Sequence, residues 1–65
     1  MTIRFITVQD AITNAPMLIR ADQINRIWET EYKGMPVRAI TFLNGDNDYV
    51  LDSLQTLTDV LTNLF

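Results

Sequence analysis

Three aspartates that lie close together in the chain are the residues best suited to chemistry. Asp46, Asp48 and Asp52 surround one predicted turn, and clustered oxygen ligands of this kind can hold Ca²⁺ or Mg²⁺. Their spacing does not match the EF-hand loop, because the glycine and the glutamate that complete such a loop are missing. Polar side chains also suit a turn that meets water and the start of a helix. We therefore predict that these aspartates are turn residues and that the chain holds no metal or other cofactor.

The composition removes most other enzyme chemistry. The chain has no cysteine and no histidine, which excludes thiol nucleophiles, histidine-based triads and ordinary zinc sites. A chain of 65 residues also rarely encloses the ~300 Å³ or more that small-molecule sites need. We expect that the protein is not an enzyme, although an active site shared between subunits would escape the objection about size.

Nucleic-acid binding is the alternative function that the basic residues suggest. There are five of them, and they could gather on one sheet face beside Trp28 or Tyr32, where stacked bases would each contribute about 1–3 kcal/mol. They are Arg4, Arg20, Arg26, Lys33 and Arg38. The net charge of −3 opposes this function, because phosphate binding depends on a positive field. We therefore keep a nucleic-acid-binding regulator as the alternative and do not expect nucleic acid to be the main partner.

The first half of the chain is predicted to contain three strands. Residues 2–8 and 17–20 are rich in β-branched and apolar residues, with a turn at 9–16 between them and a helical or turn-like corner at 21–23 after them. Residues 24–32 fit either a helix face or a strand face. We prefer a strand, because the loop signal at 33–36 and the β-type run at 37–43 would complete a hairpin.

The last third of the chain predicts a turn, a strand and a helix. Asn44-Gly45 opens a turn in which Gly45 takes a positive φ, and a strand follows at 49–52. Leucines recur at helical spacing over residues 53–64. Asp52 or Ser53 is the predicted N-cap, and Gln55 could form a capping box with Asp52. The fold class is therefore α+β: a single domain, 1–65, with an antiparallel sheet of four to five strands and one C-terminal amphipathic helix packed on one face.

A sheet covered by one helix leaves its other face bare. Neighbouring strand residues such as Ile27 and Trp28 point to opposite faces, so large apolar side chains must lie on the bare face. A contiguous apolar patch of this kind marks a partner site. The residues predicted to bind a partner are Trp28, Tyr32, Arg26, Ile6 and Leu43.

Residues 17–65 show a resemblance to a known family. Ile19, Ala21, Ile24 and Ile27 are followed by Ile40-Thr41-Phe42, Asn44-Gly45, Tyr49-Val50 and Ser53. This order resembles the small flagellar-operon proteins of the SwrD type, which influence motor power; the resemblance implies no catalytic motif. The segment from Tyr49 to Phe65 is also similar to the first part of a LytTR-type DNA-binding domain. This chain lacks the basic strand by which that family would contact DNA, so DNA binding is not implied.

These observations predict a small interaction protein. Small acidic proteins of this kind occur among phage and prophage accessory products, which is an analogy only. No apolar run approaches the ~20 residues of a membrane span, and no secretory signal is present, so we expect a soluble, cytoplasmic protein without a membrane partner. It should act as an adaptor, inhibitor or assembly subunit through an open sheet face and an edge strand. Its partner is expected to be another protein or a second copy of itself, as a homo-oligomer.

Overall fold

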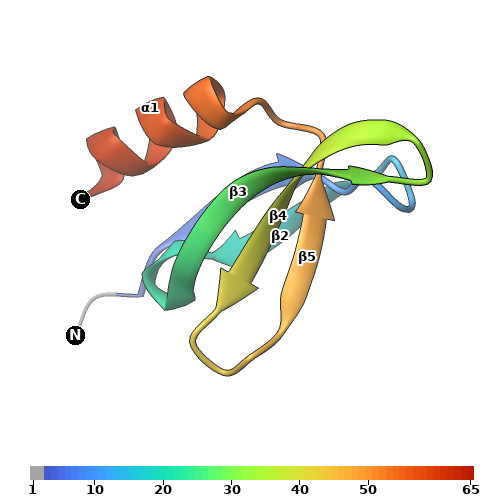
Figure 1. Ribbon diagram of the computed structural model, residues 1–65. Coiled ribbons are helices and arrows are strands. Elements are labelled where there is room, and N and C mark those ends of the chain that lie inside the picture. The colour runs from blue at the N-terminus through green and yellow to red at the C-terminus, as the bar shows by residue number, and fades with distance from the viewer. Residues whose placement is uncertain (1–2) are drawn as a thin grey trace.

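The computed structural model describes residues 3–65 and orders them as five strands and a C-terminal helix (Figure 1). The elements are β1 (Phe5–Gln9), β2 (Pro16–Arg20), the 3-10 turn η1 (Ala21–Gln23), β3 (Ile24–Tyr32), β4 (Met35–Phe42), β5 (Asn47–Val50) and α1 (Leu54–Leu64). The α+β class is confirmed. So is the preference for a strand over residues 24–32.

The strands form two antiparallel sheets, so the prediction of one sheet is wrong. One sheet pairs β1 with β2, and the other has the order β3-β4-β5. The corner at η1 turns the chain between β2 and β3, which ends the first sheet before the second begins. The sheets meet through the bridge between Asp10 and Val50, where Ala11 N–H donates to the carbonyl of Tyr49 at 2.9 Å.

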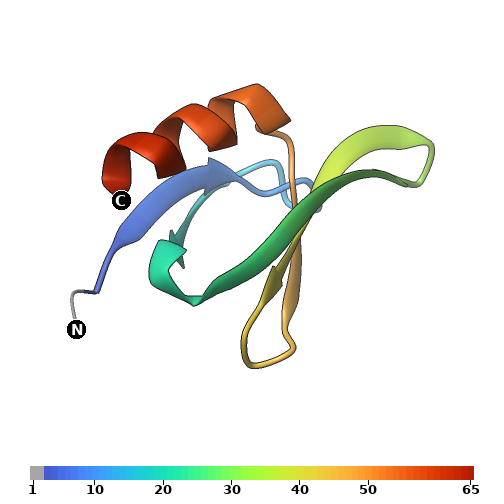
Figure 2. The same ribbon diagram turned by 60° about the vertical axis from the view of Figure 1, so that its left-hand side comes forward.

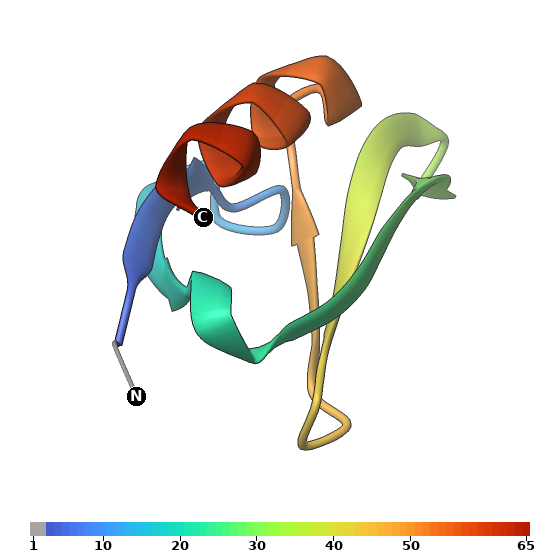
Figure 3. The same cartoon turned by 90° about the vertical axis from the view of Figure 1, so that its left-hand side faces the viewer.

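Apolar side chains from both sheets and from α1 form the main core. The buried members are Ile6, Val8, Ile19, Ala21, Ile40, Val50 and Leu57. Figure 3 shows the β1–β2 hairpin on one side, the three-stranded sheet on the other and α1 above them. The helix therefore closes over both sheets, and it does not simply cover one face of a single sheet. Each buried Ile, Val or Leu side chain contributes about 1.5–3 kcal/mol through removal from water.

Two tight turns set the register of the larger sheet. Lys33 (φ 51°) and Gly34 (φ 78°) complete the β3–β4 turn in two residues, as a turn with two left-handed residues can. Met35 and Pro36, which we predicted to lie in a loop, therefore belong to β4. In the next turn Gly45 has a φ of 96°, which confirms the positive φ predicted there.

Ser53 begins α1. Its side chain accepts a hydrogen bond from Thr56 N–H at 3.1 Å, which satisfies one of the unpaired amides of the first turn. The predicted capping box is absent among the described residues, because Gln55 donates to Asp59 at 2.9 Å and Asp52 accepts from Gln9 N–H at 2.7 Å.

Candidate functional site

One face of β3 brings together three of the residues predicted to bind a partner. Arg26, Trp28 and Tyr32 alternate along the strand after a bulge near its start, so their side chains share a face. Trp28 lies opposite Ala39 of β4, and Ala39 lies opposite Tyr49 of β5. Tyr49 therefore belongs to the same face. We call Arg26, Trp28, Tyr32, Tyr49 and the turn residue Lys33 the aromatic face.

Two tyrosines cover the middle of this face. The rings of Tyr32 and Tyr49 stack with centroids 5.4 Å apart and an interplanar angle of 28°. Tyr32 lies opposite Met35, and Tyr49 lies opposite Ala39, so the stacked rings meet across the position of Val37. Val37 is 0% exposed and Ala39 is 1% exposed, although neither belongs to the main core. The tyrosine pair thus builds a second, smaller apolar layer.

Each end of the aromatic face carries a cation. The guanidinium of Arg26 lies 4.7 Å from the centroid of the Trp28 ring, and Lys33 Nζ lies 5.5 Å from that of Tyr32. Exposed cation–π contacts of this kind contribute about 0.5–1 kcal/mol each. Trp28 is still 38% exposed. The face therefore presents a partly exposed indole with a guanidinium over its ring.

The other two predicted partner-binding residues do not join this face. Ile6 is buried in the main core, which contradicts its predicted exposure, because the inward-facing set of β1 is Ile6 and Val8 while Phe5 and Thr7 point outward. Leu43 is 63% exposed but lies beyond the end of β4, where its N–H donates to the carbonyl of Gln23 at 2.8 Å.

Tyr49 and Lys33 were not among the residues predicted to bind a protein partner, although the nucleic-acid alternative grouped Lys33 with the other basic residues beside Trp28 or Tyr32. Tyr49 alternates with the buried Val50, and this alternation signals that it points away from the core. Its distance from Tyr32 depends on the pairing of β5 with β4, which no local pattern specifies. Lys33 sits in the tight turn and reaches back over its neighbour in the chain.

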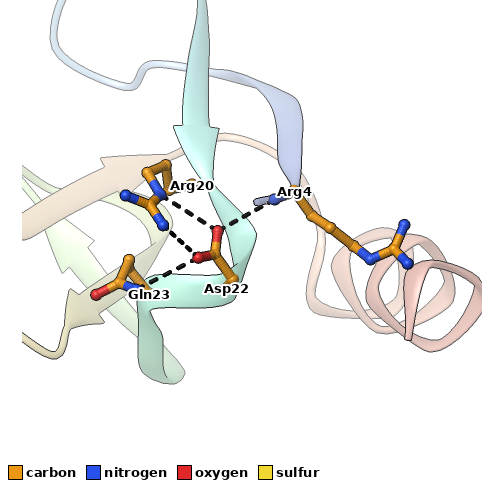
Figure 4. Close-up of polar contacts among 4 residues, drawn as sticks. All are labelled: Arg4, Arg20, Asp22 and Gln23. Carbon is orange, nitrogen blue, oxygen red and sulfur yellow. Dashed lines mark hydrogen bonds and ion pairs between the residues drawn. The ribbon is translucent and has the colours of Figure 1, made fainter. Parts of the chain in front are cut away.

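The remaining arginines have other partners. Arg20 forms a salt bridge with Asp22, whose carboxylate also accepts hydrogen bonds from Arg4 N–H at 3.2 Å and from Gln23 Nε2 at 3.3 Å (Figure 4). The bond from Arg20 is the main reason that the pKa of Asp22 lies well below its usual range. Arg38 donates to the carbonyls of Leu51 and Asp52. These contacts tie segments of the chain together, so only Arg26 and Lys33 belong to the aromatic face.

A groove of about 500 Å³ opens between β2 and the β4–β5 hairpin. It is lined in part by Ile19, Phe42, Asp46 and Asp48. Burial, followed by repulsion from Asp10 and Asp46, raises the pKa of Asp48. Arg20 lines the groove together with the carboxylates of Asp46 and Asp48, so its charge is mixed and selects no class of ligand.

Asp46, Asp48 and Asp52, which we considered as cation ligands and predicted to be turn residues, do not form a ligand cluster in the part of the chain that the structure describes. Asp52 accepts the Gln9 amide, and Asp46 bonds within its own turn to Asn44. Across residues 3–65, no group of three or more acidic, histidine or cysteine side chains is placed to hold a metal ion. In the same range no helix is long and apolar enough to cross a membrane.

Comparison with known proteins does not place the chain in a family. No protein-family model, curated protein or solved structure gives a significant match to it. The function of the chain is therefore inferred from the geometry of the aromatic face and of β3, the strand that carries most of it.

Proposed function

We propose that this chain is a non-enzymatic protein-interaction module that binds its partner through the aromatic face and the free edge of β3. The observation that supports this most is the half-exposed Trp28 with Arg26 stacked on its ring, beside the tyrosine pair. Tryptophan, tyrosine and arginine are the residues most enriched where protein interfaces gain most of their binding energy. The module would serve as an adaptor, an inhibitor or an assembly subunit.

The position of β3 supports the same function. It is an edge strand, because β4 is the only strand that pairs with it within residues 3–65. Figure 2 shows that the end of the β3–β4 hairpin projects beyond α1 and the β1–β2 hairpin. An edge strand in this position can add a strand from another chain, with backbone hydrogen bonds supplying affinity and alternate side chains supplying selectivity. The aromatic face lies on the same strand, so one partner could contact both.

The test compares two aspartate variants. Trp28→Asp places a charge in the aromatic face, and Leu18→Asp places the same charge at an exposed position of β2. Sedimentation velocity over a range of concentrations shows whether the wild type self-associates, and capture from an extract of its own cells shows whether it binds another protein. We expect Trp28→Asp to lose the association while it stays folded by circular dichroism, and Leu18→Asp to keep it. An association that survives in Trp28→Asp would contradict the proposal.

A nucleic-acid-binding regulator is the second candidate, and the cations at the aromatic face favour it. Arg26 and Lys33 beside Trp28 and Tyr32 resemble the combination of charge and stacking that holds single strands. The net charge of −3 opposes it. A gel shift with single-stranded DNA and RNA at low ionic strength separates the candidates. Binding that weakens steeply with salt would favour the nucleic-acid function. The absence of a gel shift would exclude it.

A further inference from the structure

The two-residue turn determines which backbone groups of β3 face outward. A turn of this kind makes its flanking residues, Tyr32 and Met35, a hydrogen-bonded pair. Hydrogen-bonded pairs then recur at every second residue along the hairpin. The intervening residues Glu29 and Glu31 direct their N–H and C=O groups away from β4. Since no other strand of the described part of the chain pairs with β3, these groups form the free edge.

The side chains of the free edge are acidic. Glu29 and Glu31 are both exposed and lie on the opposite face of β3 from Trp28. The Glu29 carboxylate is 67% exposed and lies at the limit of an ion pair, 4.0 Å from Arg38 Nη1. Arg38 is already bonded to two backbone carbonyls. Glu31 forms no ion pair within residues 3–65, so the edge offers two carboxylates whose charges are largely uncompensated.

A second copy of the chain does not supply the missing charge. Two copies could pair their β3 strands antiparallel, with Trp28 of one copy opposite Trp28 of the other. Glu29 then lies opposite Ile27, and Glu31 lies opposite Asn25. If the pairing is centred on Glu29 instead, the two Glu29 carboxylates meet, which is destabilising. The only basic residue of β3, Arg26, lies on the aromatic face. Charge complementarity therefore points to a different chain.

The other side of the same hairpin is less suited to pairing. The start of β4 extends beyond β5, which pairs only with residues 38–41. Pro36 lies in this unpaired stretch and has no N–H to donate. The β3 side of the projecting hairpin is therefore the side that can accept a strand.

We infer that the free edge of β3 binds an extended segment of another protein in which basic residues alternate with apolar ones. This inference rests on the proposed function and names its partner class. The basic side chains would face Glu29 and Glu31, and the apolar side chains would lie beside Trp28. The negative net charge of the chain favours the approach of such a segment.

The test uses two short synthetic peptides, one in which lysine alternates with valine and one in which glutamate replaces lysine. Binding is followed by the fluorescence of the single tryptophan and by amide shifts in NMR spectra. We expect about tenfold tighter binding of the lysine peptide, since two cross-strand charge pairs together reach about that factor. A lysine peptide methylated on the backbone nitrogens that face β3 should not bind. The Glu29→Lys/Glu31→Lys variant should reverse the preference.

A matched variant separates local charge from total charge. Asp46→Lys/Asp59→Lys alters two other exposed acidic residues and changes the net charge by the same amount. It should keep the preference for the lysine peptide. Equal binding of both peptides, binding of neither, or a reversal in this control as well would overturn the inference. The proposed function is judged separately, by whether Trp28→Asp loses its natural partner.

Discussion

The stacked pair of Tyr32 and Tyr49 should be a measurable source of stability. Replacing either tyrosine by alanine removes a half-buried ring and uncovers the apolar layer around Val37. Full burial of an aromatic side chain is worth about 3–5 kcal/mol on truncation to alanine, so we expect about 2 kcal/mol for each half-buried ring. In a domain of this size 1 kcal/mol corresponds to about 4–8 °C in Tm. Each single variant should therefore melt about 8–16 °C lower.

The double variant tests whether the rings support each other. Aromatic stacking adds about 0.5–1.5 kcal/mol beyond the area that is buried. The double variant should thus lose about 3 kcal/mol, which is less than the sum of the two single losses. Urea unfolding followed by circular dichroism gives the three free energies of unfolding.

A control cycle pairs Tyr49→Ala with Phe5→Ala, because Phe5 lies exposed on the outer face of the β1–β2 hairpin. Those two losses should add to within about 0.3–0.5 kcal/mol. If the stability losses of Tyr32→Ala and Tyr49→Ala are also additive, the two rings do not stabilise each other. That result would refute the reasoning.

Four further predictions concern the helix and two partly buried aspartates. Leu57→Ala should cost about 2–5 kcal/mol in urea unfolding because Leu57 is 2% exposed, whereas the same change at the half-exposed Leu54 should cost less. Ser53→Ala should cost about 1 kcal/mol through loss of the N-cap, and a cost near zero would contradict the cap. Asp48→Asn should raise stability at neutral pH and lose this advantage below the unfolded pKa of about 3.8, because folding raises the pKa of Asp48. Asp22→Asn should have the opposite effect, since folding lowers the pKa of Asp22. The variant should be less stable than the wild type at neutral pH. The difference in free energy of unfolding should shrink as acid protonates the wild-type carboxylate.

Local patterns in the chain predicted the elements well. The spacing of residues 24–32 fitted a helix as well as a strand, and the loop signal and β-type run that follow identified β3 as a strand. Leucine spacing identified α1. The division into two sheets was missed because alternation shows which side chains share a face of a strand, but it does not show which strands pair. The faces of β1 were also ambiguous, since Phe5 and Ile6 are both large and apolar and only packing selects Ile6 for the core.

Only part of the candidate site was predicted, because local spacing does not show which strands pair. Residues from a single strand could be grouped by their spacing, which placed Arg26, Trp28 and Tyr32 together. Tyr49 comes from another strand, so its contact with Tyr32 depends on the register of β5 against β4. Leu43 was grouped with them by extending strand alternation past Phe42, where β4 ends and the turn begins.

The most direct measurement of the central claim is site-specific photocrosslinking in the cells that make the protein. A photoreactive phenylalanine analogue replaces Trp28 in one variant and the exposed Thr58 of α1 in a matched control. The proposal predicts a discrete protein adduct from position 28, identifiable by mass spectrometry, and none from position 58. Adducts that are absent at both positions, or the same at both, would contradict the assignment of the aromatic face as the interaction surface.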